Sequence, residues 1–220
     1  MPGVEFHSSV ADGGLPDMVE VLVGKSTTIR KGDLLLLCSH ARYTASANVV
    51  RPVVSSDVMA AGTRDYAGVA PFDIFTDSSG NPIQTPAPVT LSGPQVAYAW
   101  PSMAEIIRDA VTGYLRVPIY RWSTQNRFKI KAQSDDTINF ADLHSKFWII
   151  ASAATPPANY NLSDDDPGGG FSAGAVLVGV TPDDAVNLAT AGATYGIVSP
   201  LAASDAFVTG SNPSSDDGIA

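Results

Sequence analysis

The sequence predicts a mainly β protein in which two tandem small β-barrel or sandwich modules are joined by a short capped helix. Three observations predict this class: a composition suited to strands and turns, apolar runs bounded by turn residues, and a repeat shared by the two halves. We expect a flexible N-terminal arm (1–17), a first module (18–100), a helical linker (101–114), a second module (115–200) and a flexible C-terminal tail (201–220).

The composition favours strands over helices. The chain of 220 residues is 45% hydrophobic, which is enough for a core. It contains 19 Asp but only three Glu and five Lys, together with 19 Gly and 16 Pro. Glu and Lys are good helix formers, whereas Asp, Gly and Pro favour caps and turns. Short strands joined by many turns are therefore expected.

Apolar runs between turn residues mark the expected strands. In the first module these are 18–23, 33–39, 48–54, 66–75 and 95–100, and in the second they are 114–122, 127–132, 146–152 and 173–180. The run 34–37 consists of four leucines, which predicts a strand buried on both faces, with Cys38 in the core. Pro52 predicts an edge or a bulge in the third strand.

The stretch 101–114 carries the signals of a helix of about three turns. Ser102 and Glu105 have the spacing of a capping box, and Gly113 is a natural terminator. This helix is expected to separate the two modules.

The two halves of the chain resemble each other at three places in the same order. The stretch 28–34 (TIRKGDL) matches 137–143 (TINFADL), 34–39 (LLLLCS) matches 147–152 (FWIIAS), and 68–73 (GVAPFD) matches 179–184 (GVTPDD). Each match alone is weak, but their offsets of 109, 113 and 111 agree within four residues. A duplicated module is therefore predicted, and a strand that recurs without Cys38 is interpreted as scaffold rather than as a site.

A hairpin is predicted where 114–122 and 127–132 flank the loop 123–126. Six of the 13 cationic residues lie between Arg108 and Lys131, although the chain is acidic overall. Alternation along the strands puts one set of aromatic and cationic side chains on a common outer face: Tyr120, Trp122, Arg127, Lys129 and Lys131. We interpret this face as a protein interface; a stacking platform for single-stranded nucleic acid and a sugar-binding face are the alternatives.

Other motif matches lie in the wrong context. The G-x-S-x-G stretch 170–174 follows an acidic loop and precedes a strand, whereas a hydrolase nucleophile follows a strand and opens a helix, so Ser172 is not expected to be catalytic. The run 164–166 of three Asp lacks EF-hand spacing and is interpreted as a solvated loop, with a bound calcium ion as the alternative. We predict no catalytic residue, metal ligand or cofactor.

Charge and hydropathy narrow the possible partners. The net charge of −9 argues against a generally basic surface for nucleic acid. Cys38 is the only cysteine, so an internal disulfide is excluded. The first residues lack the pattern of a signal peptide, and no apolar stretch reaches the roughly 20 residues of a membrane helix. We expect a soluble protein made in a host cytoplasm, without nucleic-acid or membrane partners.

Two short motifs resemble a known family. Lys31, Gly32 and Asp33 followed by leucines, and then the stretch 67–70 (AGVA), resemble the small β-barrel modules of tailed-phage capsid decoration, or cement, proteins. The resemblance covers roughly residues 18–75, with an echo over 137–184, where Ala141 stands in place of Gly32.

That family implies a structural protein without catalysis, which binds the outside of a phage head, commonly as a symmetric oligomer. We therefore predict a non-enzymatic virion protein on the capsid surface, which stabilises the head by binding between capsid subunits. Its predicted partners are the major capsid protein and copies of itself. The alternatives are another phage subunit, such as a tail-tube or neck protein, and a β-rich carbohydrate-binding or hydrolytic domain.

Overall fold

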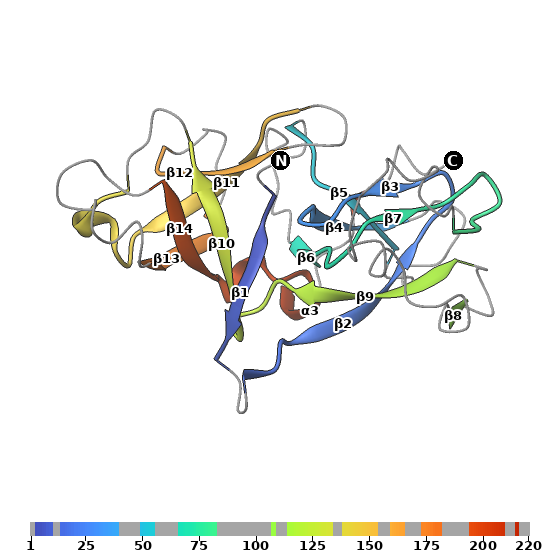
Figure 1. Ribbon diagram of the computed structural model, residues 1–220, viewed down its shortest axis with the longest axis horizontal. Helices are drawn as coiled ribbons and strands as arrows, with labels where there is room; N and C mark the ends of the chain where they lie inside the picture. Colours follow the sequence, from blue (N-terminus) through green and yellow to red (C-terminus); the bar gives the residue numbers. More distant parts are fainter. Residues whose placement is uncertain are drawn as a thin grey trace, which may run out of the picture.

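The computed structural model describes residues 3–10, 14–39, 49–55, 66–82, 107–108, 114–133, 138–153, 159–165, 173–181, 194–209 and 214–215. Within these residues the protein is mainly β and forms two five-stranded barrels, which Figure 1 shows next to each other. The predicted fold class is confirmed at this level.

The first barrel closes into a ring of five strands. Its strands are β2 (Met18–Val23), β4 (Leu34–Ser39), β5 (Val49–Pro52), β6 (Tyr66–Val69) and β9 (Leu115–Arg121). Around the ring, β2 pairs with β5, β5 with β4, β4 with β6, β6 with β9, and β9 again with β2. Of these five pairs, only β2–β5 is parallel. A separate two-stranded sheet is formed by β3 (Thr28–Ile29), which precedes β4 in the sequence, and β7 (Ile74–Phe75), which follows β6.

The second barrel has the same topology. Its strands are β10 (Asn126–Ala132), β11 (Lys146–Ala151), β12 (Tyr160–Ser163), β13 (Ala175–Val180) and β14 (Tyr195–Pro200). In both rings the first strand pairs in parallel with the third and antiparallel with the fifth, and the second strand pairs antiparallel with the third and the fourth. The fourth pairs antiparallel with the fifth. The predicted repeat is confirmed as a repeat of topology.

The turn before the second strand of each ring repeats in atomic detail. In the first barrel the Arg30 N–H donates to the Asp33 carboxylate at 2.8 Å, and the Asp33 N–H donates back to the Arg30 carbonyl at 2.9 Å. In the second barrel the Asn139 N–H and Asp142 form the same two bonds at 2.6 and 3.1 Å. The turn in the second barrel contains a short 3-10 helix, η4 (Phe140–Asp142).

Two of the three sequence matches are out of register in the structure. In the third match, Gly68 lies opposite Leu35, whereas Ala175 rather than Gly179 lies opposite Phe147. The leucine match is shifted by one residue. Leu35 packs into the core of the first barrel, and Phe147 and Ile149 pack into the core of the second. An offset of 113 would instead equate Leu34 with Phe147, but Leu34 faces out of its own barrel towards the other one. Because side chains alternate along a strand, a slip of one residue exchanges the inner and outer faces.

The predicted linker helix is wrong where the structure describes it. Within 101–114, β8 (Ile107–Arg108) is a strand that pairs antiparallel with the start of β9. The two consecutive isoleucines there favour extended backbone, and β9 supplies the hydrogen-bonding edge. The expected cap at Ser102 and the expected strand 95–100 lie outside the described residues. The first barrel includes β9, which the sequence had assigned to the second module.

The described parts of both terminal arms contain strands and short helices. From the N-terminal arm, β1 (Glu5–Ser9) pairs antiparallel with β10 of the second barrel, beside which Figure 1 shows it. From the C-terminal tail come η5 (Ala202–Ser204), α3 (Ala206–Thr209) and β15 (Ser214–Ser215), and β15 pairs in parallel with β4 of the first barrel. Each barrel is thus extended by a strand from the distant end of the chain.

The leucine run in β4 joins two cores. Leu35 belongs to the cluster that fills the first barrel, whereas Leu34 and Leu36 belong to a larger cluster that contains the core of the second. All three are at most 2% exposed. The prediction of a strand buried on both faces is confirmed for these residues, and the second face is covered by the neighbouring barrel.

Candidate functional site: the aromatic seam between the barrels

The five residues predicted to form one outer face lie on two different barrels. Tyr120 is the penultimate residue of β9, Trp122 follows that strand, and the three cations lie in β10. The predicted hairpin is wrong, because β9 pairs with β2 and β6, whereas β10 pairs with β1, β12 and β14. The loop 123–126 is therefore the crossing from one barrel to the other.

Trp122 is the centre of the contact between the barrels. Its side chain is fully buried, stacks on Phe128 with 4.9 Å between ring centroids, and meets the Tyr66 ring edge-on at 5.4 Å. The indole Nε1–H donates to the Ser204 hydroxyl at 3.1 Å, and this hydroxyl donates to the Gly174 carbonyl at 2.7 Å. A buried indole with its N–H satisfied is a structural anchor. The prediction that Trp122 is exposed on an outer face is wrong.

Tyr120 packs against the N-terminal strand. Its ring stacks on Phe6 with 4.5 Å between centroids, and Phe6 also meets Phe128 edge-on at 6.2 Å. We call the group of Phe6, Tyr66, Tyr120, Trp122 and Phe128 the aromatic seam. It draws on both barrels and on β1.

Two of the three predicted cations already have partners in the chain. Arg127 donates to the Thr124 carbonyl at 2.8 Å and to the Ser199 hydroxyl at 2.9 Å, and its partial burial lowers its pKa. Lys129 forms an ion pair with Glu5 at 3.5 Å and lies 4.5 Å from the centroid of the Tyr195 ring. Lys131 lies further along β10, is half-buried, and is opposite Tyr195 in the sheet.

The sequence did not predict the polar bonds that fix the crossing. The Asn126 side chain is fully buried, donates to the Asp17 and Arg121 carbonyls at 2.8 Å each, and accepts from the Asp17 N–H at 2.9 Å. Arg121 forms an ion pair at 3.0 Å with Asp205, which is 2% exposed. The available signal was the charge of Asp205 next to an apolar run in the tail, but nothing in the sequence indicated Arg121 as its partner.

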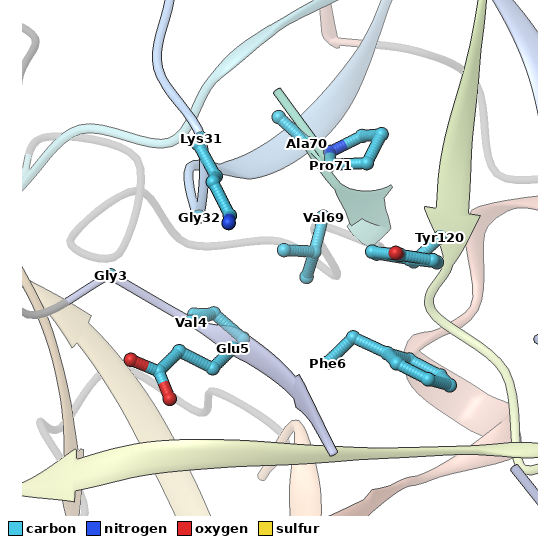
Figure 2. Close-up of a pocket in the computed structure, with 10 residues that line it drawn as sticks. All are labelled: Gly3, Val4, Glu5, Phe6, Lys31, Gly32, Val69, Ala70, Pro71 and Tyr120. Carbon is cyan, nitrogen blue, oxygen red and sulfur yellow. The ribbon is translucent and has the colours of Figure 1, made fainter. Parts of the chain in front are cut away.

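A cavity of about 380 Å³ lies between β1 and the first barrel. Figure 2 shows Phe6 facing Tyr120 at one end of it, with Val69 directed towards the N-terminal segment. Glu5 and Lys31 are the charged residues in its lining. The N-terminal segment is anchored by the Val4 N–H, which donates to the Gly32 carbonyl at 2.8 Å.

Asp33 lies beside this anchor and has an unusual environment. It is 3% exposed, and burial raises the pKa of its carboxyl group from 3.8 to about 6, against the lowering effect of the hydrogen bond from Arg30. Nearby Asp73 also raises the pKa, while the Arg30 charge lowers it. Gly32 has a φ of +85°, a conformation that glycine adopts most easily.

The remaining sequence candidates give no site in the described residues. Ser172 and Asp166 lie outside them, as does the side chain of Cys38, while Asp164 and Asp165 are exposed. Among the described residues, no group of three or more His, Cys, Asp or Glu is placed to hold a metal ion. In the same part of the chain, no helix has the length and apolar character needed to cross a membrane.

Comparison with known protein families, curated proteins and solved structures gave no match to this chain. The candidate site is therefore defined by its geometry alone: an aromatic seam that joins two barrels of one topology and receives both terminal segments.

Proposed function

We propose that the protein is a non-enzymatic structural protein of a virion, which decorates the outside of a phage head and stabilises it by binding between capsid subunits. One observation supports this best: the two stretches that resemble decoration proteins form a single hydrogen-bonded cluster. The Gly32 N–H donates to the Ala70 carbonyl at 2.9 Å, and the Ala70 N–H donates to the Asp33 carbonyl at 3.0 Å. Both motifs therefore build one corner of the first barrel.

The way the barrels are joined also supports a mechanical role. One hydrophobic cluster runs from the outer face of the first barrel into the core of the second, and the Ser55 N–H donates to the Ala153 carbonyl across the junction at 2.8 Å. The terminal strands β1 and β15 tie each barrel to the opposite end of the chain. A subunit built in this way resists separation of its modules, which suits a protein that holds its neighbours together.

The test uses heads of the phage that encodes this chain, assembled without it. Purified protein is mixed with these heads and sedimented, and heat release of the packaged DNA is then measured with and without it. We expect saturable binding at a fixed number of copies per head and a higher temperature of DNA release. Heat-denatured protein is the control for non-specific sedimentation.

The rival functions are tested in parallel. Purified tail tubes and a panel of immobilised glycans are offered to the same preparation. Failure to bind heads, combined with saturable binding to tubes or to one glycan class, would replace the decoration proposal by the corresponding alternative. Failure to bind any of them would reject all of these functions for the isolated chain.

A further inference from the structure

The cavity between β1 and the first barrel has an apolar lining with an aromatic end. Val4, Val69 and Pro71 contribute apolar side chains, and the stacked rings of Phe6 and Tyr120 lie at one end. All of its lining residues belong to the described part of the chain. Its volume of about 380 Å³ lies within the range of ligand pockets, about 300–1,000 Å³, so it has room for a large side chain and its neighbours.

Lys31 supplies the positive charge of this cavity. Figure 2 shows its side chain extending towards the N-terminal segment, whereas the Glu5 carboxylate points away from Val69. That carboxylate already forms an ion pair with Lys129 at 3.5 Å. Among the described residues, no carboxylate forms an ion pair with the Lys31 ammonium group. The cavity therefore offers one cation that this part of the chain does not neutralise.

The backbone that carries Lys31 is fixed by hydrogen bonds. The Lys31 N–H donates to the Asp73 carboxylate at 2.7 Å. The next residue, Gly32, donates through its N–H to the Ala70 carbonyl at 2.9 Å and accepts from the Val4 N–H at 2.8 Å. Because these bonds are present without a ligand, binding needs to order the Lys31 side chain but not the turn, which lowers the entropic cost.

We propose that this cavity binds an acidic peptide segment of a partner protein, with an aromatic side chain against Val69 and Tyr120 and a neighbouring carboxylate at Lys31. The ring would fill the apolar part of the cavity, and the carboxylate would pair with the free ammonium group. The net charge of −9 is spread over the whole chain, and charges more than about 8 Å away are screened at physiological ionic strength. The nearest charge, that of Lys31, therefore governs the contact.

The identity of the partner rests on the proposed function, under which the acidic segment belongs to a capsid subunit. The cavity is tested on the isolated full chain with dipeptides, and decoration is tested with heads, so either proposal can fail while the other stands. A chain that binds the acidic dipeptide in the cavity but ignores heads refutes the decoration role alone. A chain that binds heads but no dipeptide refutes the cavity site alone.

The experiment is a titration of the isotope-labelled full chain, followed by the NMR shifts of its amides. The probes are acetyl-Asp-Phe-amide and its neutral analogue acetyl-Asn-Phe-amide. We expect millimolar binding, with shifts concentrated at residues 3–6, 31–33 and 69–71. The neutral dipeptide should bind about threefold more weakly, because it cannot form an ion pair with Lys31, and added salt should reduce this preference.

Lys31→Gln should bind the two dipeptides equally. The matched control is Lys25→Gln, which makes the same change at an exposed lysine in the turn after β2, outside the cavity, and should keep the wild-type preference. No binding by the wild type, shifts confined to other residues, or an undiminished preference in Lys31→Gln would each overturn the proposal. Circular dichroism verifies that both variants are folded.

A second measurement uses heads and reverses the charge. Lys31→Glu should bind heads at least about tenfold more weakly than the wild type, because it places a like charge against the carboxylate of the partner. Lys25→Glu, with the same change in net charge, should bind as the wild type does. Undiminished binding of Lys31→Glu to heads would overturn the assignment of the cavity to the capsid contact.

Discussion

The turn before β4 and the turn before β11 have the same hydrogen bonds in different surroundings. Asp33 is 3% exposed in a turn that receives the N-terminal segment, whereas the second turn presents Phe140 with 59% of its surface exposed. The outward side chains of the strands that follow differ in the same way. Those of β4 and β6 are buried by the second barrel, whereas those of β11 and β13 are half-buried or exposed. The repeated topology therefore gives the two turns the same hydrogen bonds, whereas the segments packed around each turn determine how far it is exposed to solvent.

The largest difference is expected between two tryptophans. Trp122 is fully buried in the aromatic seam, and its replacement by Ala should destabilise the fold by about 3–5 kcal/mol, since it leaves a large cavity and removes the hydrogen bond from the indole N–H to the Ser204 hydroxyl. Trp148 is half-buried on the outward face of β11, so Trp148→Ala should cost roughly 1 kcal/mol. Urea unfolding measures both, and similar losses for the two would contradict the seam as the main junction.

A second contrast lies in the glycines of the repeated G-V-x-P motif. A Cβ atom at Gly68 would overlap the Tyr120 carbonyl oxygen, because β6 and β9 approach closely there, whereas a Cβ at Gly179 would meet nothing within 4 Å. We expect Gly68→Ala to cost about 2–3 kcal/mol through displaced backbone and Gly179→Ala to be close to neutral. Thermal unfolding measures the difference. A tolerated Gly68→Ala would show that the strands can separate freely.

The third contrast concerns pH. Because the pKa of Asp33 is raised from 3.8 to about 6 in the folded state, that state binds the proton more tightly than the unfolded chain does. This contribution is fully present below pH 3.8 and is lost as the pH rises through about 6, for a total of up to about 3 kcal/mol. Urea unfolding of the wild type at several pH values should show this fall.

Asp33→Asn should abolish the Asp33 part of that slope, because Asn stays neutral and still accepts the hydrogen bond from Arg30. Asp142→Asn makes the same substitution in the half-buried turn, and its slope should still contain the Asp33 contribution. Equal slopes for the wild type and Asp33→Asn would refute the buried carboxyl as the source.

The smallest effect is expected at the N-terminal strand. Glu5→Gln removes the ion pair with Lys129, in which the Glu5 side chain is 66% exposed. Exposed pairs of this kind contribute about 0.2–1 kcal/mol, and salt reduces that further. Amide exchange of β1 should therefore rise slightly at low salt and match the wild type at high salt. A large loss of protection in both conditions would mean that the pair, rather than Phe6, holds the strand.

Alternation along individual strands was predictable, whereas the partners of those strands were not. Leu115, Val117 and Ile119 point into the first barrel, so Tyr120 and Trp122 lie on its outside, as the pattern indicates. This outer surface of the first barrel is, however, buried in its contact with the second barrel. Which strand pairs with β9 depends on residues 18–23 and 66–69, and local periodicity carries no information about such distant partners.

The candidate site shows the same limit. The protein interface predicted for the aromatic and cationic residues between positions 120 and 131 stays a prediction, and within the chain these residues contact Phe6, Glu5 and Ser204. The prediction of a short helix from Ser102 and Glu105 failed for a related reason. Helix signals depend on neighbouring residues in the sequence, whereas the pairing of β8 with β9 is a tertiary contact that overrides them. The repeat of topology was predictable from comparing the two halves of the chain, although the second and third sequence matches are out of register in the structure.

The position of β1 has a consequence for biosynthesis. This strand leaves the ribosome before the strands of the first barrel, whereas its partner β10 follows only after all five of those strands have been made. The first barrel can therefore close during translation while the strand Glu5–Ser9 waits with its backbone groups exposed to water. The strand docks only when Lys129 and its neighbours emerge, at the cost of closing a long loop. An unpaired β1 therefore indicates an incomplete chain, and the pairing of β1 with β10 shows that the second barrel has begun to form.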